Sequence, residues 1–181
     1  MNLIPLLNAN RSKVLLIGDS RSIGVKCQTV YNASIRGLQM FHLKTFQTDG
    51  LKNIEVLILS LGINDILAGY ETDYILENYS KWVNSSLIKN EKCSIYILLP
   101  LEVTNVDLFL RSSENINNQI RLFNTQITDV FGDISRVQIV QITKLNRDIF
   151  ASDGIHFSKR GNELYSNAVC NEIIKIRMDE Y

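Results

Sequence analysis

The sequence predicts an α/β fold in which helices cover both faces of a parallel sheet. Unbroken apolar runs bounded by polar residues are typical of strands buried on both faces, and such runs recur along the chain. Patterns of helical period lie between them, so strands and helices alternate, with right-handed crossovers between parallel strands. The strand candidates are Val14 to Ile17, Val56 to Leu61, Ile95 to Leu99 and Val137 to Ile142, with a weaker one at Gln28 to Tyr31.

Three segments carry apolar residues at helical spacing. Ile75, Tyr79 and Val83 share one face in the first segment, and Ile116 and Ile120 belong to a similar stripe in the second. Polar residues that can cap a helix precede both stripes. The predicted helices run from Thr72 or Asp73 to Leu87, from Ser112 or Ser113 to Gly132, and from Gly161 to about Arg177.

Length and composition predict one domain over residues 1–181, because 181 residues with 45% hydrophobic content bury one full core but not two. Lys plus Arg and Asp plus Glu both total 19, and no run of like charge stands out, so nucleic acid is not expected as a partner. No stretch approaches the length of a membrane span. Pro5 interrupts the apolar residues near the N-terminus and no basic leader precedes them, so a cytoplasmic protein is expected. The sequence indicates no oligomeric state.

The cysteines are Cys27, Cys93 and Cys170, an odd number placed far apart with no C-x-x-C pair. This pattern argues against a disulfide framework and against a zinc site. We therefore expect buried, reduced thiols and no metal.

Ser20 follows the first predicted strand, in the sequence Gly18-Asp19-Ser20. If a helical turn begins there, outward N–H groups and the helix dipole would favour an anion beside it. A helix N-cap is the ordinary structural role of such a serine. The segment is neither a G-x-S-x-G elbow, because Ser22 occupies the final glycine position, nor a Walker phosphate loop, because no Gly-Lys-Ser or Gly-Lys-Thr follows. Ser20 is a candidate nucleophile that needs a base.

His156 is the candidate base, because Asp153 precedes it by three positions across Gly154. One tight turn could aim the carboxylate at Nδ1 and leave Nε2 free to accept the proton of Ser20. The alternative is an Asp/His turn with a structural hydrogen bond. The second histidine, His42, lies among apolar residues on a predicted helix and is interpreted as a structural or surface residue.

Two further residues are candidates for stabilising an oxyanion. Asn64 follows the strand Val56 to Leu61, where its amide could donate to developing negative charge, although an Asx turn or helix cap is equally compatible. Gly37 lies at a predicted helix start, where an unhindered N–H could be a further donor. A glycine at an ordinary turn is the commoner explanation.

These residues together resemble the SGNH hydrolases, also called GDSL-type esterases and lipases. The motifs are Gly18-Asp19-Ser20, Gly37, Gly62-Ile63-Asn64-Asp65 and Asp153-Gly154-Ile155-His156, which span nearly the whole chain. The resemblance implies a flavodoxin-like three-layer α/β/α sandwich around a five-stranded parallel sheet. It implies Ser20 as nucleophile, His156 as base, Asp153 as the residue that orients it, and an oxyanion hole from Ser20 N–H, Gly37 N–H and Asn64 Nδ2.

Two positions depart from the family pattern. Arg21 stands where an apolar residue commonly follows the serine, and it either pairs with Asp19 or Asp65 or receives an anionic group of the substrate. Phe157 replaces a frequent proline after the histidine.

The expected activity is ester hydrolysis through an acyl-enzyme without metal or organic cofactor. A small-molecule or glycan ester is the expected substrate, with acetyl on a carbohydrate favoured because the loops between the motifs are short. Lysophospholipase or thioesterase activity and O-acyl transfer are the enzymatic alternatives, and a catalytically silent binding module is the alternative of another class.

Overall fold

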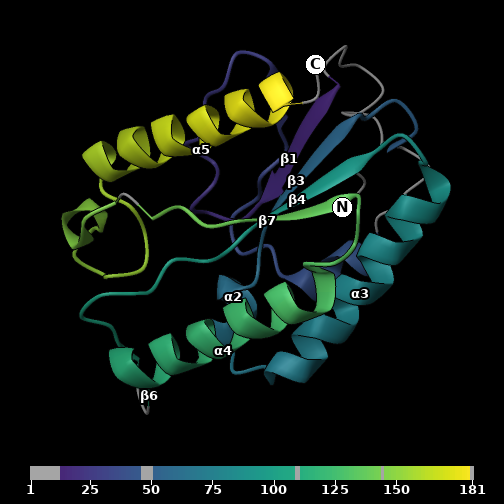
Figure 1. Ribbon diagram of the computed structural model, residues 1–181. Helices are drawn as coiled ribbons and strands as arrows, with labels where there is room; N and C mark the ends of the chain where they lie inside the picture. The colour runs from purple at the N-terminus through teal and green to yellow at the C-terminus, as the bar shows by residue number, and fades with distance from the viewer. Residues whose placement is uncertain (1–12, 46–50, 109–110, 144, 180–181) are drawn as a thin grey trace.

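The sheet has five strands, all paired in parallel, in the order β2-β1-β3-β4-β7 (Figure 1). The structure is a computed structural model, and it describes residues 13–45, 51–108, 111–143 and 145–179. This strand order is the flavodoxin-like one, in which the order reverses between β1 and β3 and ligands bind at the carboxyl ends of the strands beside that point. The strands are β1 (Val14–Gly18), β2 (Val30–Asn32), β3 (Val56–Ser60), β4 (Ser94–Leu98) and β7 (Val137–Val140).

Helices cover the two faces of the sheet, as predicted, and make it the middle layer of three (Figure 1). The helix α5 (Lys159–Asp179) lies on one face, and α2 (Ile63–Leu67), α3 (Thr72–Lys89) and α4 (Ser113–Phe131) lie on the other. The strand residues alternate between two cores, so that Leu15 and Leu57 pack on the α3 and α4 side whereas Leu16 and Ile58 pack on the α5 side. The remaining elements are the 3-10 helices η1 (Met40–Thr45) and η3 (Arg147–Ile149) and the short antiparallel strands β5 (Asp107–Leu108) and β6 (Arg111–Ser112).

The predicted strands and the three long predicted helices exist, with shifted ends. The helix start predicted at Gly37 is wrong, because Gly37 lies in a turn and η1 begins only at Met40. The edge strand β2 begins two residues later than the weak candidate at Gln28 to Tyr31, and α5 begins two residues earlier than predicted. Ser112 is the N-cap of α4, where its Oγ accepts from Asn115 N at 3.3 Å, and Gly132 ends the helix. None of the described helices is both long enough and apolar enough to cross a membrane.

The expectation of reduced thiols is wrong for two of the three cysteines. Cys27, in the loop after the Ser20 turn, and Cys170, on α5, form a disulfide with Cα atoms 5.6 Å apart. Spacing argued against a bridge because 143 residues separate them, but the fold brings the β1–β2 loop onto α5. Cys93 is buried and free, and burial raises the pKa of its thiol to about 11.

Candidate active site

The nucleophile candidate Ser20 lies half-buried in a tight turn directly after β1. Ser22 N donates to Asp19 O at 3.1 Å and Val25 N donates to Ser22 O at 3.0 Å, so residues 20–24 form consecutive turns. The predicted helical turn is therefore wrong, because residues 20–24 form turns and no helix begins at Ser20. Gly18 is required by space, because a Cβ there would stand 2.6 Å from the Cβ of Ser22.

Asp19 organises this turn from the inside. It is 2% exposed, and its Oδ1 accepts from Arg21 N at 2.9 Å. Burial raises the pKa of the Asp19 carboxyl to about 6, against the lowering effect of the Arg21 N–H and of the nearby Arg21 and His156 charges. The carboxyl group thus holds the backbone of residues 20–24, which carry the candidate nucleophile and are called the nucleophile turn.

Asp153 and His156 are directly hydrogen-bonded, with Asp153 Oδ2 2.7 Å from His156 Nδ1. The other carboxylate oxygen accepts from the backbone N–H groups of Ile155 and His156, each at 2.9 Å. Burial opposes ionisation of Asp153, but these hydrogen bonds outweigh it and hold the pKa of the carboxyl below its ordinary value. With Nδ1 occupied, Nε2 is the imidazole nitrogen left to exchange a proton with a substrate or a serine.

Gly154 makes the turn between them possible. Its φ is +66°, and a Cβ there would stand 1.3 Å from the carbonyl oxygen of Thr104. Thr104 N donates to Gly154 O at 2.9 Å, which fixes the turn to the segment after β4. A side chain at position 154 would therefore displace the Asp153 and His156 pair.

Arg21 links the nucleophile turn to the histidine loop. Its Nε donates to Ile155 O at 2.8 Å and its Nη1 donates to Leu101 O at 2.7 Å, while its guanidinium carbon lies 5.3 Å from the ring centre of Phe150. It forms no ion pair with Asp19 or Asp65, and it is 5% exposed. The predicted pairing of Arg21 with Asp19 or Asp65 is therefore wrong, because its guanidinium binds backbone carbonyls instead of a carboxylate. Binding of an anionic substrate group by Arg21 stays a prediction.

The oxyanion candidates Asn64 and Gly37 come from adjoining segments. Asn64 Nδ2 donates to Leu38 O at 3.0 Å, and Gln39 Nε2 donates to the backbone carbonyl of Asn64 at 3.1 Å. Gly37 has a φ of +70° and is exposed. Ile35 N donates to Gly18 O at 2.9 Å, which ties the Gly37 segment to the end of β1.

Asp65, on α2, also joins the segment that carries Asn64 to the segment that follows Gly37. It is 1% exposed, and both carboxylate oxygens lie 3.0 Å from Met40 N, at the start of η1. Burial raises the pKa of Asp65 to about 6, with the negative charge of Asp19 adding to the effect and the Met40 N–H opposing it. The segments that carry Gly37 and Asn64 are therefore fixed to each other.

One cavity of about 730 Å³ is lined by both Ser20 and His156. Its volume falls within the range of about 300 to 1,000 Å³ that is typical of small-molecule sites. Gly37 and Asn64 do not line it, whereas Arg36, next to Gly37, does. The other lining residues are Ile23, Gly24, Lys26, Phe157, Lys159, Asn162, Glu163, Ser166 and Asn167.

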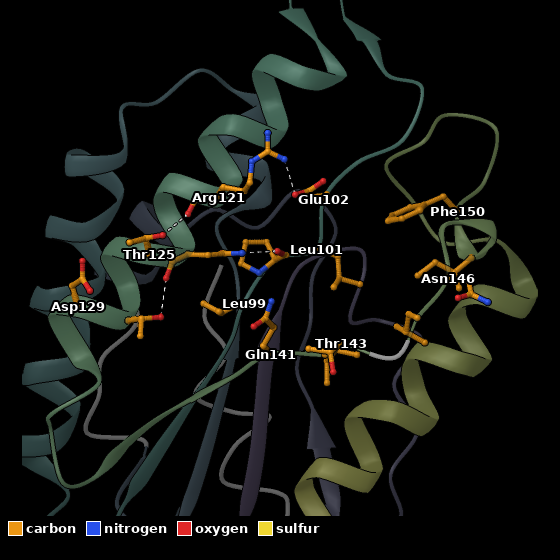
Figure 2. A pocket seen from close by; sticks show the side chains of 16 residues that line it. Leu99, Leu101, Glu102, Arg121, Thr125, Asp129, Gln141, Thr143, Asn146 and Phe150 are labelled. Atoms are coloured by element: carbon orange, nitrogen blue, oxygen red, sulfur yellow. Dashed lines mark hydrogen bonds and ion pairs between the residues drawn. The ribbon is translucent and has the colours of Figure 1, made fainter.

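A second cavity of equal volume contains neither residue of the Ser20 and His156 pair (Figure 2). It lies between α4 and the segments that follow β4 and β7. Figure 2 shows Arg121, on α4, directed at Glu102, and the two form an ion pair at 2.8 Å. Arg121 is the one lysine or arginine among the described residues that line this second cavity, and the Glu102 carboxylate neutralises its charge.

Comparison with solved structures identifies the fold. A carbohydrate esterase family 3 from Talaromyces cellulolyticus has a similar structure, with a TM-score of 0.72 at 16% identity, and the match covers 93% of this chain and 99% of that one. An acetyl esterase mutant with acetate ion gives a TM-score of 0.71 at 16% identity, and the match covers 94% of this chain and 100% of that one. A GDSL-like lipase from Bacteroides thetaiotaomicron gives a TM-score of 0.71 at 14% identity and covers 96% of each chain. The chain has the SGNH hydrolase fold.

Comparison of sequences finds relatives that are not named as esterases or lipases. The chain is 30% identical over 169 residues to N-acylneuraminate cytidylyltransferases of Streptococcus agalactiae, a match that covers 88% of this chain. The chain spans 38% of the length of these relatives. No protein-family model matches the chain.

Several residues of the candidate site could not be predicted from the sequence. Lys26, Arg36 and Lys159 line the cavity, but Lys26 and Arg36 flank β2 and Lys159 lies more than 100 residues later, so no local pattern marks the three together. The buried hydrogen bond of 2.7 Å from Ser22 Oγ to Ser60 Oγ, which joins the nucleophile turn to the end of β3, was also missed. The sequence offered one indication of this hydrogen bond, which is a serine, Ser22, two positions after Ser20.

Proposed function

We propose that this protein is a serine ester hydrolase that works through an acyl-enzyme. The observation that carries the proposal is the Asp153 to His156 hydrogen bond of 2.7 Å beside a cavity that Ser20 and His156 both line. A serine hydroxyl becomes a competent nucleophile when a base takes its proton, and an oriented imidazole is the usual base.

In the proposed reaction, Ser20 Oγ attacks the ester carbonyl while His156 Nε2 takes the hydroxyl proton. Asp153 holds the imidazole in the tautomer that presents Nε2 and stabilises its charge. Ser20 N–H, Gly37 N–H and Asn64 Nδ2 are the proposed donors to the oxyanion. His156 then gives the proton to the leaving alcohol, and water, activated by the same imidazole, releases the acid from Ser20.

For the substrate we propose an acetyl ester of a carbohydrate, and an O-acetylated N-acylneuraminate as the first compound to test. Two findings support this choice: the fold is shared with a carbohydrate esterase and an acetyl esterase, and the relatives that match 88% of the chain are named for N-acylneuraminate. Cytidylyl transfer is not proposed, because that name describes a protein of which this chain spans 38%.

The test is hydrolysis of 4-nitrophenyl esters of increasing acyl length, together with acetate release from O-acetylated N-acetylneuraminic acid. The proposal predicts a preference for acetate over long acyl chains and a loss of activity in Ser20→Ala to below about 1% of wild type. Equal activity of Ser20→Ala would contradict the esterase mechanism. A preference for long acyl chains would instead favour the lysophospholipase or thioesterase alternative.

A further inference from the structure

The cavity that holds Ser20 and His156 has an uneven charge distribution in a chain with no net charge. Lysine plus arginine and aspartate plus glutamate both total 19 in the whole sequence. The cavity lining nevertheless includes Lys26, Arg36 and Lys159 against the single carboxylate of Glu163. The cavity therefore has a local excess of positive charge, although the whole chain has none.

The three cationic side chains reach the cavity from different parts of the fold. Lys26 follows the nucleophile turn, Arg36 precedes Gly37 in the loop after β2, and Lys159 is the first residue of α5. Lys26 N donates to Ser166 Oγ at 2.9 Å, which anchors the Lys26 backbone on α5. The fold thus gathers three separate cations around the hydroxyl and imidazole of the site.

These cations are available to a ligand. Each is exposed, and none forms an ion pair with a carboxylate in the part of the chain that the structure describes. The second cavity differs in this respect, because its Arg121 is paired with both Glu102 and Glu114 at 2.8 Å. Unpaired cations beside a reacting group favour a substrate that carries negative charge.

We infer that the substrate of this site carries a carboxylate, which Arg36, Lys26 and Lys159 bind while the ester lies between Ser20 and His156. This inference rests on the proposed esterase function and deepens it by naming the residues that bind the charged group of the substrate. An acidic sugar has such a carboxylate, and its planar group suits the guanidinium of Arg36 for paired hydrogen bonds. The anionic group that the sequence suggested for Arg21 is therefore assigned to this cluster.

The experiment compares two acetyl esters that differ in one charge: O-acetylated N-acetylneuraminic acid and its carboxyl methyl ester. Acetate release is measured for both, so that cleavage of the methyl ester does not count. The inference predicts that kcat/KM is higher for the acid at low salt and that this preference shrinks as ionic strength rises. If neither sugar is cleaved, 4-acetoxybenzoate and its methyl ester form the matched pair.

Variants test whether these three cations cause the preference. Arg36→Gln, Lys26→Gln and Lys159→Gln should each reduce the ratio of kcat/KM for the acid to that for its methyl ester by about two- to fivefold, the effect of one exposed ion pair. Glu163→Gln should raise the ratio, because it removes a repulsive charge. The matched control is Arg160→Gln, an exposed neighbour of Lys159 that does not line the cavity, and it should leave the ratio unchanged.

The failures of the two proposals are distinguishable. Equal kcat/KM for acid and methyl ester, or equal effects of Arg160→Gln and Lys159→Gln, would overturn the carboxylate inference and leave the esterase function standing. Absence of hydrolysis of all these esters and of 4-nitrophenyl acetate by folded wild-type protein would overturn the esterase function itself. Melting curves confirm that each variant is folded.

Discussion

Arg21 Nε donates a hydrogen bond of 2.8 Å to the carbonyl of Ile155, across 134 residues of sequence. Arg21 directly follows the proposed nucleophile Ser20, and Ile155 directly precedes the proposed base His156. The second bond, to Leu101 O, ties both to the segment after β4. The relative position of hydroxyl and imidazole therefore depends on one buried guanidinium.

Replacing Arg21 should impair every ester equally. Arg21→Leu leaves the half-buried carbonyls of Ile155 and Leu101 without their donor, at a cost of about 1 kcal/mol each. We expect a lower Tm and a fall in kcat of similar size for neutral and anionic esters, with Arg21→Lys intermediate because one amine cannot reproduce the forked geometry. A rise in KM confined to anionic esters, with Tm unchanged, would restore Arg21 to substrate binding.

The activity should rise with pH through a single ionisation. A general base must be neutral to accept a proton, so protonation of the base stops the reaction. His156→Asn should abolish this ionisation together with most of kcat/KM. The matched variant is His42→Asn, on η1, where His42 Nδ1 accepts from Gln39 N at 3.1 Å. If His42→Asn removed the ionisation instead, the assignment of the base would be wrong.

The disulfide should contribute to stability. A bridge between Cys27 and Cys170 constrains a loop of more than 140 residues in the unfolded chain, and native disulfides typically contribute about 2 to 5 kcal/mol. The Cys27→Ser, Cys170→Ser double variant should unfold at lower urea concentration than the oxidised wild type. Dithiothreitol should lower the wild-type midpoint and leave the double variant unchanged. Equal midpoints for oxidised and reduced wild type would show that the bridge contributes nothing.

Asp65 should make the free energy of unfolding fall with rising pH. Burial raises its pKa from 3.8 to about 6, so the folded protein binds this proton more tightly than the unfolded chain does. The resulting stabilisation is fully present below about pH 3.8 and is lost as pH rises through about 6. Relative to Asp65→Asn, the free energy of unfolding of the wild type should fall by roughly 1 to 3 kcal/mol between about pH 4 and 7, as measured by urea unfolding. A pH-independent difference between the two proteins would show that the pKa of Asp65 is not raised by folding.

The layers and the order of the motifs could be predicted from the sequence because they depend on local patterns. An unbroken run such as Val56 to Leu59 has no polar face, so it belongs in the middle of a parallel sheet, and the polar residues after it belong at the carboxyl edge. The short strand β2 was placed imprecisely, because its three residues are all half-buried and carry a weak pattern.

The long-range features could not be predicted in the same way. The role of Arg21 depends on carbonyl groups 80 and 134 residues away, and backbone carbonyls leave no mark in a sequence. The bridge from Cys27 to Cys170 depends on α5 lying against the loop after β1. The turn after Ser20 resembles a helix start in composition, but the structure has consecutive turns there, in which the buried Asp19 carboxyl accepts from Arg21 N.

In the proposed mechanism Ser20 is the residue that becomes covalently acylated during turnover. A fluorophosphonate, which mimics the acyl-transfer transition state, should phosphonylate the same hydroxyl irreversibly, and the intact mass of the protein reports this reaction. We predict one adduct per chain, located on the Ser20 peptide by fragmentation, absent in Ser20→Ala and strongly slowed in His156→Asn. An adduct on another residue, or a folded wild-type protein that hydrolyses 4-nitrophenyl acetate without forming any adduct, would show that Ser20 is not the nucleophile.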